Sequence, residues 1–318
     1  MRSVENLVSV LVPVYNRKDI IIETLNSALF QTYEHIEVVV VDNCSVDGTW
    51  ELISDLAKTD SRLKIFRNDT NVGPVRNWLR CLEEAKGTYG KILWSDDLIA
   101  PDFLEQTIPL LKDQDVGFVF TATRVFSSDP LHGKLHHSIG ASGIYDTERF
   151  IEGDMSGAGY PVSPGCALFR LQDLRESLLL QIPNAIGSDF SMHAIGNDLL
   201  LFLLVSNKYP KYAFVSDVLS FFRAHEGSIS ISSKNCKLPL HYNLARAHFV
   251  EFFRPDLICK LNASLYLHLL RYPDSKEYGV VEISNFYVNN KIASFSRFHL
   301  AQLVISKVAR RYIPIWAA

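Results

Sequence analysis

The sequence predicts an α/β fold, in which a mostly parallel central sheet is flanked by helices and followed by a C-terminal helical extension. Over the first third of the chain, short β-branched runs alternate with amphipathic helical patterns, which is typical of parallel sheets covered on both faces. Polar clusters follow three of these runs, and ligands of open α/β sheets bind at the carboxyl ends of strands. From about Leu238 onward the pattern is helical.

The expected elements follow one another in a regular order. Strands are expected at 7–13, 36–42, 63–68, 89–94, 116–121, 166–170 and 213–223, and helices at 19–31, 48–57, 75–85, 101–111 and from Gly196. The stretch 127–143, with His132, His136 and His137, is expected to be a solvated loop. We divide the chain into an α/β domain over residues 1–235 and a helical region over 236–318 that faces either a membrane or another subunit.

The composition, 47% hydrophobic and 21% charged over 318 residues with a net charge of -3, is that of an ordinary globular protein. No apolar run approaches the roughly 20 residues needed to cross a bilayer. The apolar stretch 7–15 is preceded by Glu5, is interrupted by Ser9 and Pro13, and lacks a cleavage site, so we interpret it as a buried strand. Five scattered cysteines without a C-x-x-C pair indicate neither a disulfide framework nor a zinc site, and we expect a cytoplasmic location.

Four motifs stand at the ends of the predicted strands and helices: P-V-Y-N-R at 13–17, V-D-N-x-S-x-D-G-T at 41–49, N-x-G-x-x-x-N at 71–77 and W-S-D-D at 94–97. As a set they resemble the family-2 glycosyltransferases with the GT-A fold, over about residues 7–225. The resemblance implies transfer of a sugar from a nucleotide diphosphate, with inversion and with a divalent cation.

The resemblance also implies residues that contact the nucleotide. Asp42 ends a strand, where a carboxylate can accept hydrogen bonds from a base or ribose, although Asp42 could instead cap a turn with Asn43 and Ser45. The nucleotide-binding residues implied in this way are Pro13, Tyr15, Asp42, Arg76 and Asp96.

A metal site is expected at Ser95-Asp96-Asp97, because a diphosphate leaving group concentrates negative charge and needs a hard cation with oxygen ligands. By resemblance, Asp97 and His225 are the metal ligands, Arg223 neutralises the diphosphate, and the cation is Mn²⁺ or Mg²⁺. Ser95 replaces the first acid of the more familiar D-x-D form. The alternative is a turn before the helix at Pro101, which leaves two adjacent carboxylates without a counter-charge.

Inverting transfer also needs a carboxylate that takes the proton of the acceptor hydroxyl. The family places it in an acidic pair that opens a helix after the sheet, and Gly196-Asn197-Asp198 has that context. Asp198 is therefore the predicted general base, with Asp189 in reserve. Asn197 or Asp198 could instead be a simple helix cap.

The function predicted from these motifs is inverting, metal-assisted transfer of a hexose from a nucleotide-diphosphate sugar, with UDP as the expected nucleotide, to a glycan or lipid-linked saccharide of the polysaccharide or O-antigen type. The alternative is a catalytically inactive module on the same fold that binds nucleotide sugars or glycans. A Rossmann dehydrogenase is disfavoured because no G-x-G-x-x-G follows the first strand. No nucleic-acid partner is expected.

The tail, residues 284–318, contains five basic residues and no acidic one. Its apolar residues have helical spacing, and two interpretations stay open. The tail packs on its own domain or in a homo-oligomer, or it forms an interfacial helix on the anionic inner face of the cell membrane, next to a polyprenyl-diphosphate-linked acceptor. The basic residues are Lys291, Arg297, Lys307, Arg310 and Arg311, and the apolar ones are Phe286, Ile292, Phe295, Phe298, Leu303, Ile305, Ile313 and Trp316.

Overall fold

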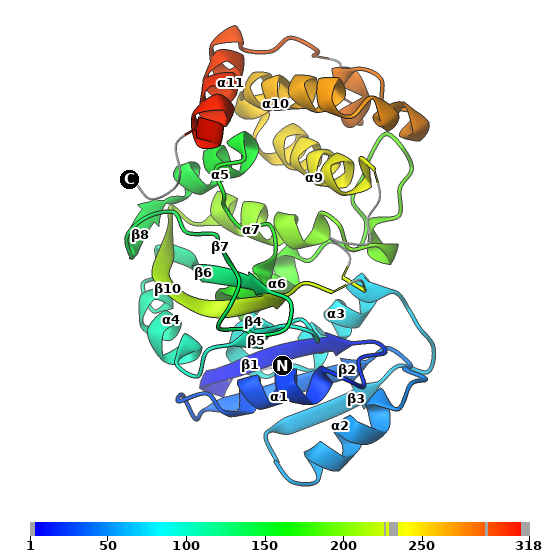
Figure 1. Cartoon of the computed structure of the whole chain (residues 1–318), viewed down its shortest axis with the longest axis vertical. Helices are drawn as coiled ribbons and strands as arrows, with labels where there is room; N and C mark the ends of the chain where they lie inside the picture. Colours follow the sequence, from blue (N-terminus) through cyan, green and yellow to red (C-terminus); the bar gives the residue numbers. More distant parts are fainter. Residues whose placement is uncertain (1–3, 226, 229–234, 290–291, 313–318) are drawn as a thin grey trace.

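The computed structural model describes residues 4–225, 227–228, 235–289 and 292–312 (Figure 1). The strands are β1 Val4–Val14, β2 Ile36–Asp42, β3 Leu63–Arg67, β4 Gly87–Ile92, β5 Leu98–Ile99, β6 Val116–Phe126, β7 Lys134–His136, β8 Gly143–Asp146, β9 Ala167–Arg170 and β10 Lys211–Arg223. The α-helices are α1 Ile21–Leu29, α2 Thr49–Ala57, α3 Pro74–Glu84, α4 Phe103–Leu111, α5 Thr147–Ser156, α6 Leu171–Ser177, α7 Asn197–Lys208, α9 Lys237–Phe253, α10 Ile258–Arg271 and α11 Arg297–Tyr312. The predicted fold class, a central sheet flanked by helices, is confirmed.

All ten strands belong to one sheet, whose main path runs β3-β2-β1-β4-β9-β6-β10-β5. The first four strands of this path are parallel, as the alternating sequence pattern predicts. Beyond them the sheet is mixed, because β9 inserts antiparallel between β4 and β6. The parallel pairing sets Val14 beside Asp42, so β1 and β2 end at the same edge.

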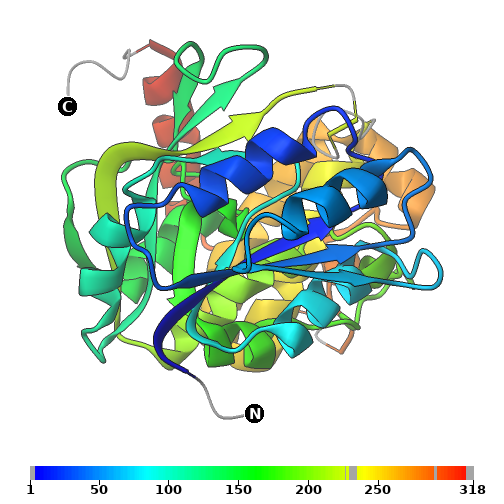
Figure 2. The ribbon, with the colours of Figure 1, turned by 90° about the horizontal axis from the view of Figure 1, so that it is seen from below.

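The sheet is buried on both faces, and consecutive residues of a strand serve opposite layers. Val38 and Val40 of β2 pack in the core beneath α1, α2 and α4, whereas Val39 and Val41 pack with α3, α6 and α7. Figure 2 shows α1 and α2 on one side of the sheet and α3 on the other. This double burial explains why β2 is apolar from Val38 to Val41.

The structure differs from the sequence prediction between residues 127 and 177. The stretch 127–143 is not wholly a loop, since β7 pairs with β6 and β8, which begins at Gly143, pairs with β10. His137 was expected in solvent, but its ring contacts Thr123 at 3.1 Å and burial lowers its pKa to about 3. Helices α5 and α6 carry no long apolar period and were not expected.

The helices after residue 236 pack on the α/β part through α7. Leu199, Leu200 and Leu203 of α7 are fully buried in one cluster with Leu240 and Leu244 of α9. That cluster therefore includes residues from both sides of the domain boundary expected at residue 235. All five cysteines are free. Among the described helices, none combines the length and the apolarity that crossing a bilayer would require.

Candidate functional site

Asp42, the last residue of β2, has a fully buried carboxylate. The pairing of β2 with β3 sets it opposite Arg67, whose Nε lies 3.1 Å from Oδ2 of Asp42. The backbone N–H of Ser45 donates to the same oxygen at 3.1 Å. The turn interaction with Ser45 is thus present, and Arg67 balances the buried charge. The contact of Asp42 with a nucleotide stays a prediction.

A network of amide side chains holds the loop between β3 and α3. Asn43 donates to Asn71 at 2.8 Å and accepts from Asn68 at 3.0 Å, and Asn68 also donates to Asn77. Gly73 has a φ of +86°, a conformation that favours glycine. The N-x-G-x-x-x-N motif therefore anchors the start of α3 to the end of β2.

Arg76 and Asp189, which are 113 positions apart in the sequence, meet through Ser191. Nη1 of Arg76 donates to Oγ of Ser191 at 2.7 Å, and this hydroxyl donates to Oδ1 of Asp189 at 2.6 Å. The hydrogen bonds from Ser191 hold the pKa of Asp189 below its usual range, although partial desolvation opposes them. A carboxylate with a lowered pKa is a weak proton acceptor, so Asp189 is the poorer of the two predicted bases.

The structure brings Asp96, Asp97, Arg223 and His225 together. The backbone N–H of Arg223, at the end of β10, donates to Oδ1 of Asp97 at 2.9 Å, and Nε of Arg223 donates to the carbonyl oxygen of Asp96 at 3.0 Å. Nε2 of His225 lies 2.8 Å from Oδ2 of Asp96. Burial and the neighbouring Asp96 carboxylate hold the pKa of Asp97 well above its usual range.

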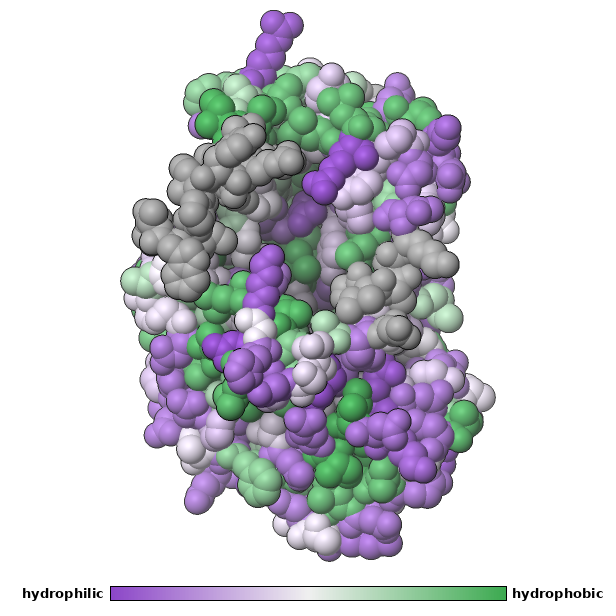
Figure 3. All heavy atoms as spheres, viewed as in Figure 1, coloured by the Kyte–Doolittle hydropathy of each residue, from purple (hydrophilic) through white to green (hydrophobic). Residues whose placement is uncertain are grey.

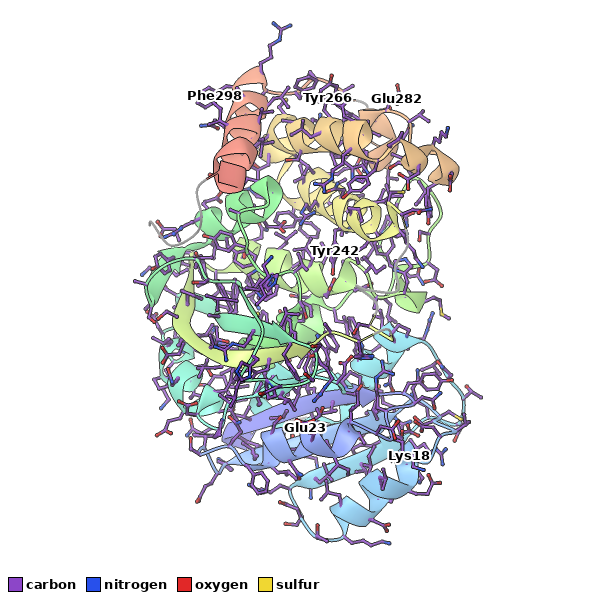
Figure 4. All side chains as sticks on the ribbon, viewed as in Figure 1. Lys18, Glu23, Tyr242, Tyr266, Glu282 and Phe298 are labelled. Carbon is purple, nitrogen blue, oxygen red and sulfur yellow. The ribbon has the colours of Figure 1, made fainter. Side chains whose placement is uncertain are left out.

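The guanidinium of Arg223 is paired with a residue that the sequence did not single out. Its Nη2 lies 2.5 Å from Oε2 of Glu23 on α1, which Figure 4 labels, and its planar group stacks on the ring of Phe126. The aromatic contact and the ion pair fix the side chain at the edge of the Asp96–Asp97 pair. The diphosphate contact of Arg223 stays a prediction.

Lys91 on β4 is a second buried charge near this cluster. Its ammonium group lies 4.4 Å from the centre of the Phe103 ring and donates to the carbonyl oxygen of Gly165. Burial lowers the pKa of Lys91 to about 7, while Cys166 and Asp97 oppose this shift. Lys91 thus lies close enough to supply part of the positive charge that the buried Asp97 requires.

The remaining predicted nucleotide contacts lie at the end of β1. Tyr15 is 41% exposed, so its ring is open to a ligand. Pro13 is buried and borders a small apolar cavity with Trp78, Leu82 and Leu201. A ring in that position packs between the sheet and its helices. The ligand contacts of both residues stay predictions.

Asp198 lies in the first turn of α7 and is largely buried. Its Oδ1 accepts hydrogen bonds from the backbone N–H groups of Gly196 and Leu199, at 2.9 and 2.8 Å. Its Oδ2 accepts from the hydroxyl of Tyr242 on α9 at 2.8 Å. Burial raises the pKa of Asp198 to about 6, and the three hydrogen bonds oppose this rise. A carboxylate with such a pKa is suited to accept a proton near neutral pH.

The sequence did not single out Arg67, Lys91, Ser191 or Tyr242. For Arg67 there was a signal, because a charged residue at the end of a strand beside Asp42 is a natural counter-ion. Ser191 and Tyr242 carried none, since their partners are far away in the sequence and are reached only through the tertiary fold.

The side chains gathered here are of the kinds that bind divalent cations. Two carboxylates and an imidazole lie together, and hard cations prefer oxygen ligands. Burial and the neighbouring Asp96 carboxylate both disfavour the charged form of Asp97, and a bound cation would favour it. Within the described ranges, no group of three or more His, Cys, Asp or Glu side chains is placed so that it could hold a metal ion. His225 is hydrogen-bonded to Asp96, so this pair would have to open for both side chains to ligate.

The sequence model of Glycosyl transferase family 2 matches residues 9–178, more than half of the chain and the part that carries Asp42, Asp96 and Asp97. The chain belongs to glycosyltransferase family 2. Like other members it has the GT-A fold, so the predicted family and fold are confirmed.

Two curated relatives illustrate the similarity. The Escherichia coli protein named UDP-Glc:alpha-D-GlcNAc-diphosphoundecaprenol beta-1,3-glucosyltransferase WfaP is 35% identical over 133 residues, which are 39% of this family-2 chain and 52% of WfaP. Glycosyltransferase GlyG of Streptococcus pneumoniae is 24% identical over 226 residues, covering 70% of this chain and 72% of GlyG. The chain matches at most about half the length of the first three curated relatives.

Among solved structures, that of residues 1–349 of S. aureus TarS in complex with UDP-GlcNAc aligns with a TM-score of 0.64. The two chains are 19% identical, and the alignment covers 84% of this chain and 74% of that one. At this identity the likeness concerns the fold alone. It extends well beyond residue 178, where the family match ends.

The raised pKa of Asp198 predicts a pH-dependent contribution to stability. Folding favours the protonated carboxyl, so its contribution to the free energy of unfolding is complete below pH 4 and is lost as the pH rises through about 6. This shift of the Asp198 pKa by about two units corresponds to about 3 kcal/mol in the free energy of unfolding. Relative to Asp198→Asn, which does not titrate, the wild type should lose about this amount between pH 4 and 7.

Urea unfolding of both proteins at each pH measures this difference, and all other titrating groups cancel in it. Parallel stability curves for the two proteins would contradict the raised pKa of Asp198.

Proposed function

We propose that this protein is an inverting glycosyltransferase that transfers a hexose from a UDP-linked donor to a saccharide acceptor. The main support is the group formed by Asp96, Asp97, Arg223 and His225 in a chain of family 2, next to the strand edge that carries Asp42. UDP is proposed for two reasons. The name of the similar protein WfaP includes UDP-Glc, and the similar TarS structure is a complex with UDP-GlcNAc.

In this proposal the donor binds across the carboxyl ends of β1 and β2. Asp42, held by Arg67 and Ser45, accepts hydrogen bonds from the base or ribose, and Tyr15 lines the same side. Arg76 at the start of α3 reaches the nucleotide from the loop that the amide network anchors. Asp96 contacts the ribose, and Arg223 neutralises part of the diphosphate charge.

Asp97 and His225, with Asp96 beside them, would hold Mg²⁺ or Mn²⁺. When bound, such a cation stabilises the negative charge that develops on the diphosphate leaving group. The residues of this chain pre-organise the site: Arg223 N–H orients Asp97, and Glu23 holds the guanidinium in place. The positive groups around Asp97 reduce the repulsion between the adjacent carboxylates.

Asp198 is the proposed general base. The acceptor oxygen attacks the anomeric carbon from the side opposite the diphosphate and forms the new C–O bond. The bond from that carbon to the phosphate oxygen breaks, and UDP leaves with the electron pair. Asp198 takes the proton of the acceptor hydroxyl. One glycosidic bond with inverted configuration has then replaced the bond to the phosphate, and one proton has moved to the carboxylate.

The proposed acceptor is a saccharide carried on a polyprenyl diphosphate, as in the name of WfaP, and α11 is proposed to lie on the membrane surface. Phe286 and Leu303 of the tail are buried in their own domain, and Phe295 stacks on Tyr266. By contrast, Phe298 and Ile305 are 69% and 67% exposed and are two helical turns apart on one face. The side chains of Lys291, Lys307, Arg310, Arg311, Ile313 and Trp316 lie outside the described part.

The first functional prediction concerns Asp97→Asn. The amide keeps the size of the side chain but loses its charge, so metal-dependent release of UDP from UDP-glucose or UDP-N-acetylglucosamine should be lost. The affinity for UDP in the presence of Mn²⁺ should fall in parallel. Without metal the variant should be at least as stable as the wild type at pH 8, because a buried, repelled charge has been removed.

Calorimetric UDP binding and UDP release test this, with exposed Asp217→Asn on β10 as the matched control. Wild-type turnover that persists in excess chelator would contradict the metal role. Binding of UDP with no release from any nucleotide sugar would support the inactive binding module instead.

The second functional prediction separates binding from chemistry. Asp198→Asn should leave the affinity for UDP within about twofold of wild type, because Asp198 lies outside the Asp96–His225 group, while kcat falls by about 10² to 10⁴. Steady-state kinetics of sugar transfer or donor hydrolysis measure both quantities. An unchanged kcat would reject Asp198 as the base and leave Asp189 to be tested in the same way.

The membrane prediction uses exposed side chains, so that the fold is preserved. The full chain should co-sediment with vesicles containing anionic lipid at low ionic strength and dissociate at high salt, since each basic residue near such a surface contributes about 1 kcal/mol. The double variant Phe298→Ser, Ile305→Ser should bind severalfold more weakly. Equal binding to neutral vesicles, or equal binding by the variant, would leave α11 as a packing element only.

A further inference from the structure

The two oxygens of the Asp198 carboxylate are not equivalent. Oδ1 accepts from two backbone N–H groups, which use both of its lone pairs. Oδ2 accepts from Tyr242 and from no other donor in the described part of the chain. One lone pair of Oδ2 is therefore left for a proton, and the Tyr242 hydroxyl determines its direction.

Tyr242 comes from α9, outside the α/β domain expected over residues 1–235. Figure 4 shows Tyr242 between α9 and α7, and Figure 3 shows that this face of the molecule is hollowed between the C-terminal helices and the sheet. The side chain is partly exposed, and burial raises the pKa of its hydroxyl, so the hydroxyl stays a donor near neutral pH. The contact with Asp198 thus bridges α9 and α7.

Helix α9 is held in place on both sides of Tyr242. One turn later, Arg246 forms two hydrogen bonds with Asp154 on α5, at 2.8 and 2.6 Å. One residue earlier, Nε2 of His241 lies 2.9 Å from Oγ of Ser188, in the loop that also carries Asp189. These contacts allow the Tyr242 hydroxyl little freedom to move away from α7.

α9 packs tightly against the residue that precedes α7, Gly196. Gly196 has a φ of +108°, and a Cβ atom added to it would lie 2.9 Å from the Cβ of Ala245. Such a contact is shorter than real carbon atoms allow, so only glycine lets α9 lie here. The backbone N–H of this glycine is one of the two donors to Oδ1 of Asp198.

We propose that Tyr242 is a positioning residue for the transfer reaction, whose hydroxyl holds Oδ2 of Asp198 so that its one remaining lone pair takes the proton of the acceptor. The C-terminal helices are then part of the catalytic unit. This inference rests on the general-base role proposed above for Asp198. The hydroxyl also stabilises the ionised carboxylate, since a hydrogen bond to the charged form lowers the pKa of an acid.

The other charged or titratable groups around this contact are an ion pair and two imidazoles. Arg246 on α9 and Asp154 on α5 form an ion pair. In the adjoining loop, burial lowers the pKa of His193 to about 4, and burial also lowers the pKa of His241 on α9, so both rings lose their proton below their ordinary range. A titration near pH 6 that is present in the wild type and absent from Asp198→Asn therefore reports on Asp198 itself.

The test compares full-length Tyr242→Phe with wild type and with Tyr287→Phe. Tyr287 is a matched control because its buried hydroxyl donates to Asn262 in the same helical region and does not touch Asp198. UDP release from UDP-glucose and UDP-N-acetylglucosamine with Mn²⁺, water being the acceptor, gives kcat and KM between pH 5 and 8. The ¹³C resonance of the Asp198 carboxyl, assigned by its absence in Asp198→Asn, gives its pKa directly.

Tyr242→Phe should lower kcat about tenfold, leave the donor KM within about twofold, and move the acid limb of kcat and the carboxyl resonance up by about one pH unit. Tyr287→Phe should change none of these. If Asp198→Asn is inactive while Tyr242→Phe keeps the wild-type kcat and pKa, only the positioning role is overturned. If Asp198→Asn retains full turnover, the general-base assignment fails, and the positioning role fails with it.

Discussion

The parallel pairing of β1 with β2 and β4, and of β2 with β3, is the constraint on which the rest of the site depends. Because parallel strands in register end at a common edge, Val14, Asp42 and Arg67 lie side by side although the sequence separates them by more than twenty residues at each step. The polar turns that follow these strands must then share that edge. β10 extends it from the far side and delivers Arg223 to Asp97.

Burial makes this edge electrostatically demanding. Asp42 and Asp97 are both withdrawn from water. Arg67 neutralises Asp42 directly, whereas among the described residues Asp97 has a backbone N–H, the nearby Lys91 and Arg223, which is already paired with Glu23. The carboxylate of Asp42 is thus already neutralised, in a structural ion pair with Arg67. That of Asp97 has an excess of negative charge, which is the condition under which a cation or a cationic ligand gains most from binding.

The sequence predicts well the strands that are covered on both faces and the helices whose ends are defined by neighbouring residues. β2 matches its expected range because both of its faces are covered. α3 begins at Pro74, one residue before its expected start, because Gly73 and the proline define where it begins. β5 has only two residues and exists through its pairing with β10, so no local pattern reveals it. The same distinction holds in the site. Asp96 and Asp97 are adjacent in a recognisable motif, whereas the partner of Asp198 lies 44 residues away on a helix whose amphipathic pattern does not distinguish Tyr242 from its neighbours.

The buried leucines of α7 also have a consequence for folding during synthesis. Leu199, Leu200 and Leu203 are synthesised well before Leu240 and Leu244, which cover them in the finished fold. A nascent chain that has emerged only to residue 235 can pair its strands, yet it presents these apolar side chains to water and to neighbouring chains. A chain that is released or cleaved at residue 235 would expose an apolar surface that is prone to aggregation. The C-terminal helices therefore complete the burial of α7, which the α/β part of the chain leaves unfinished.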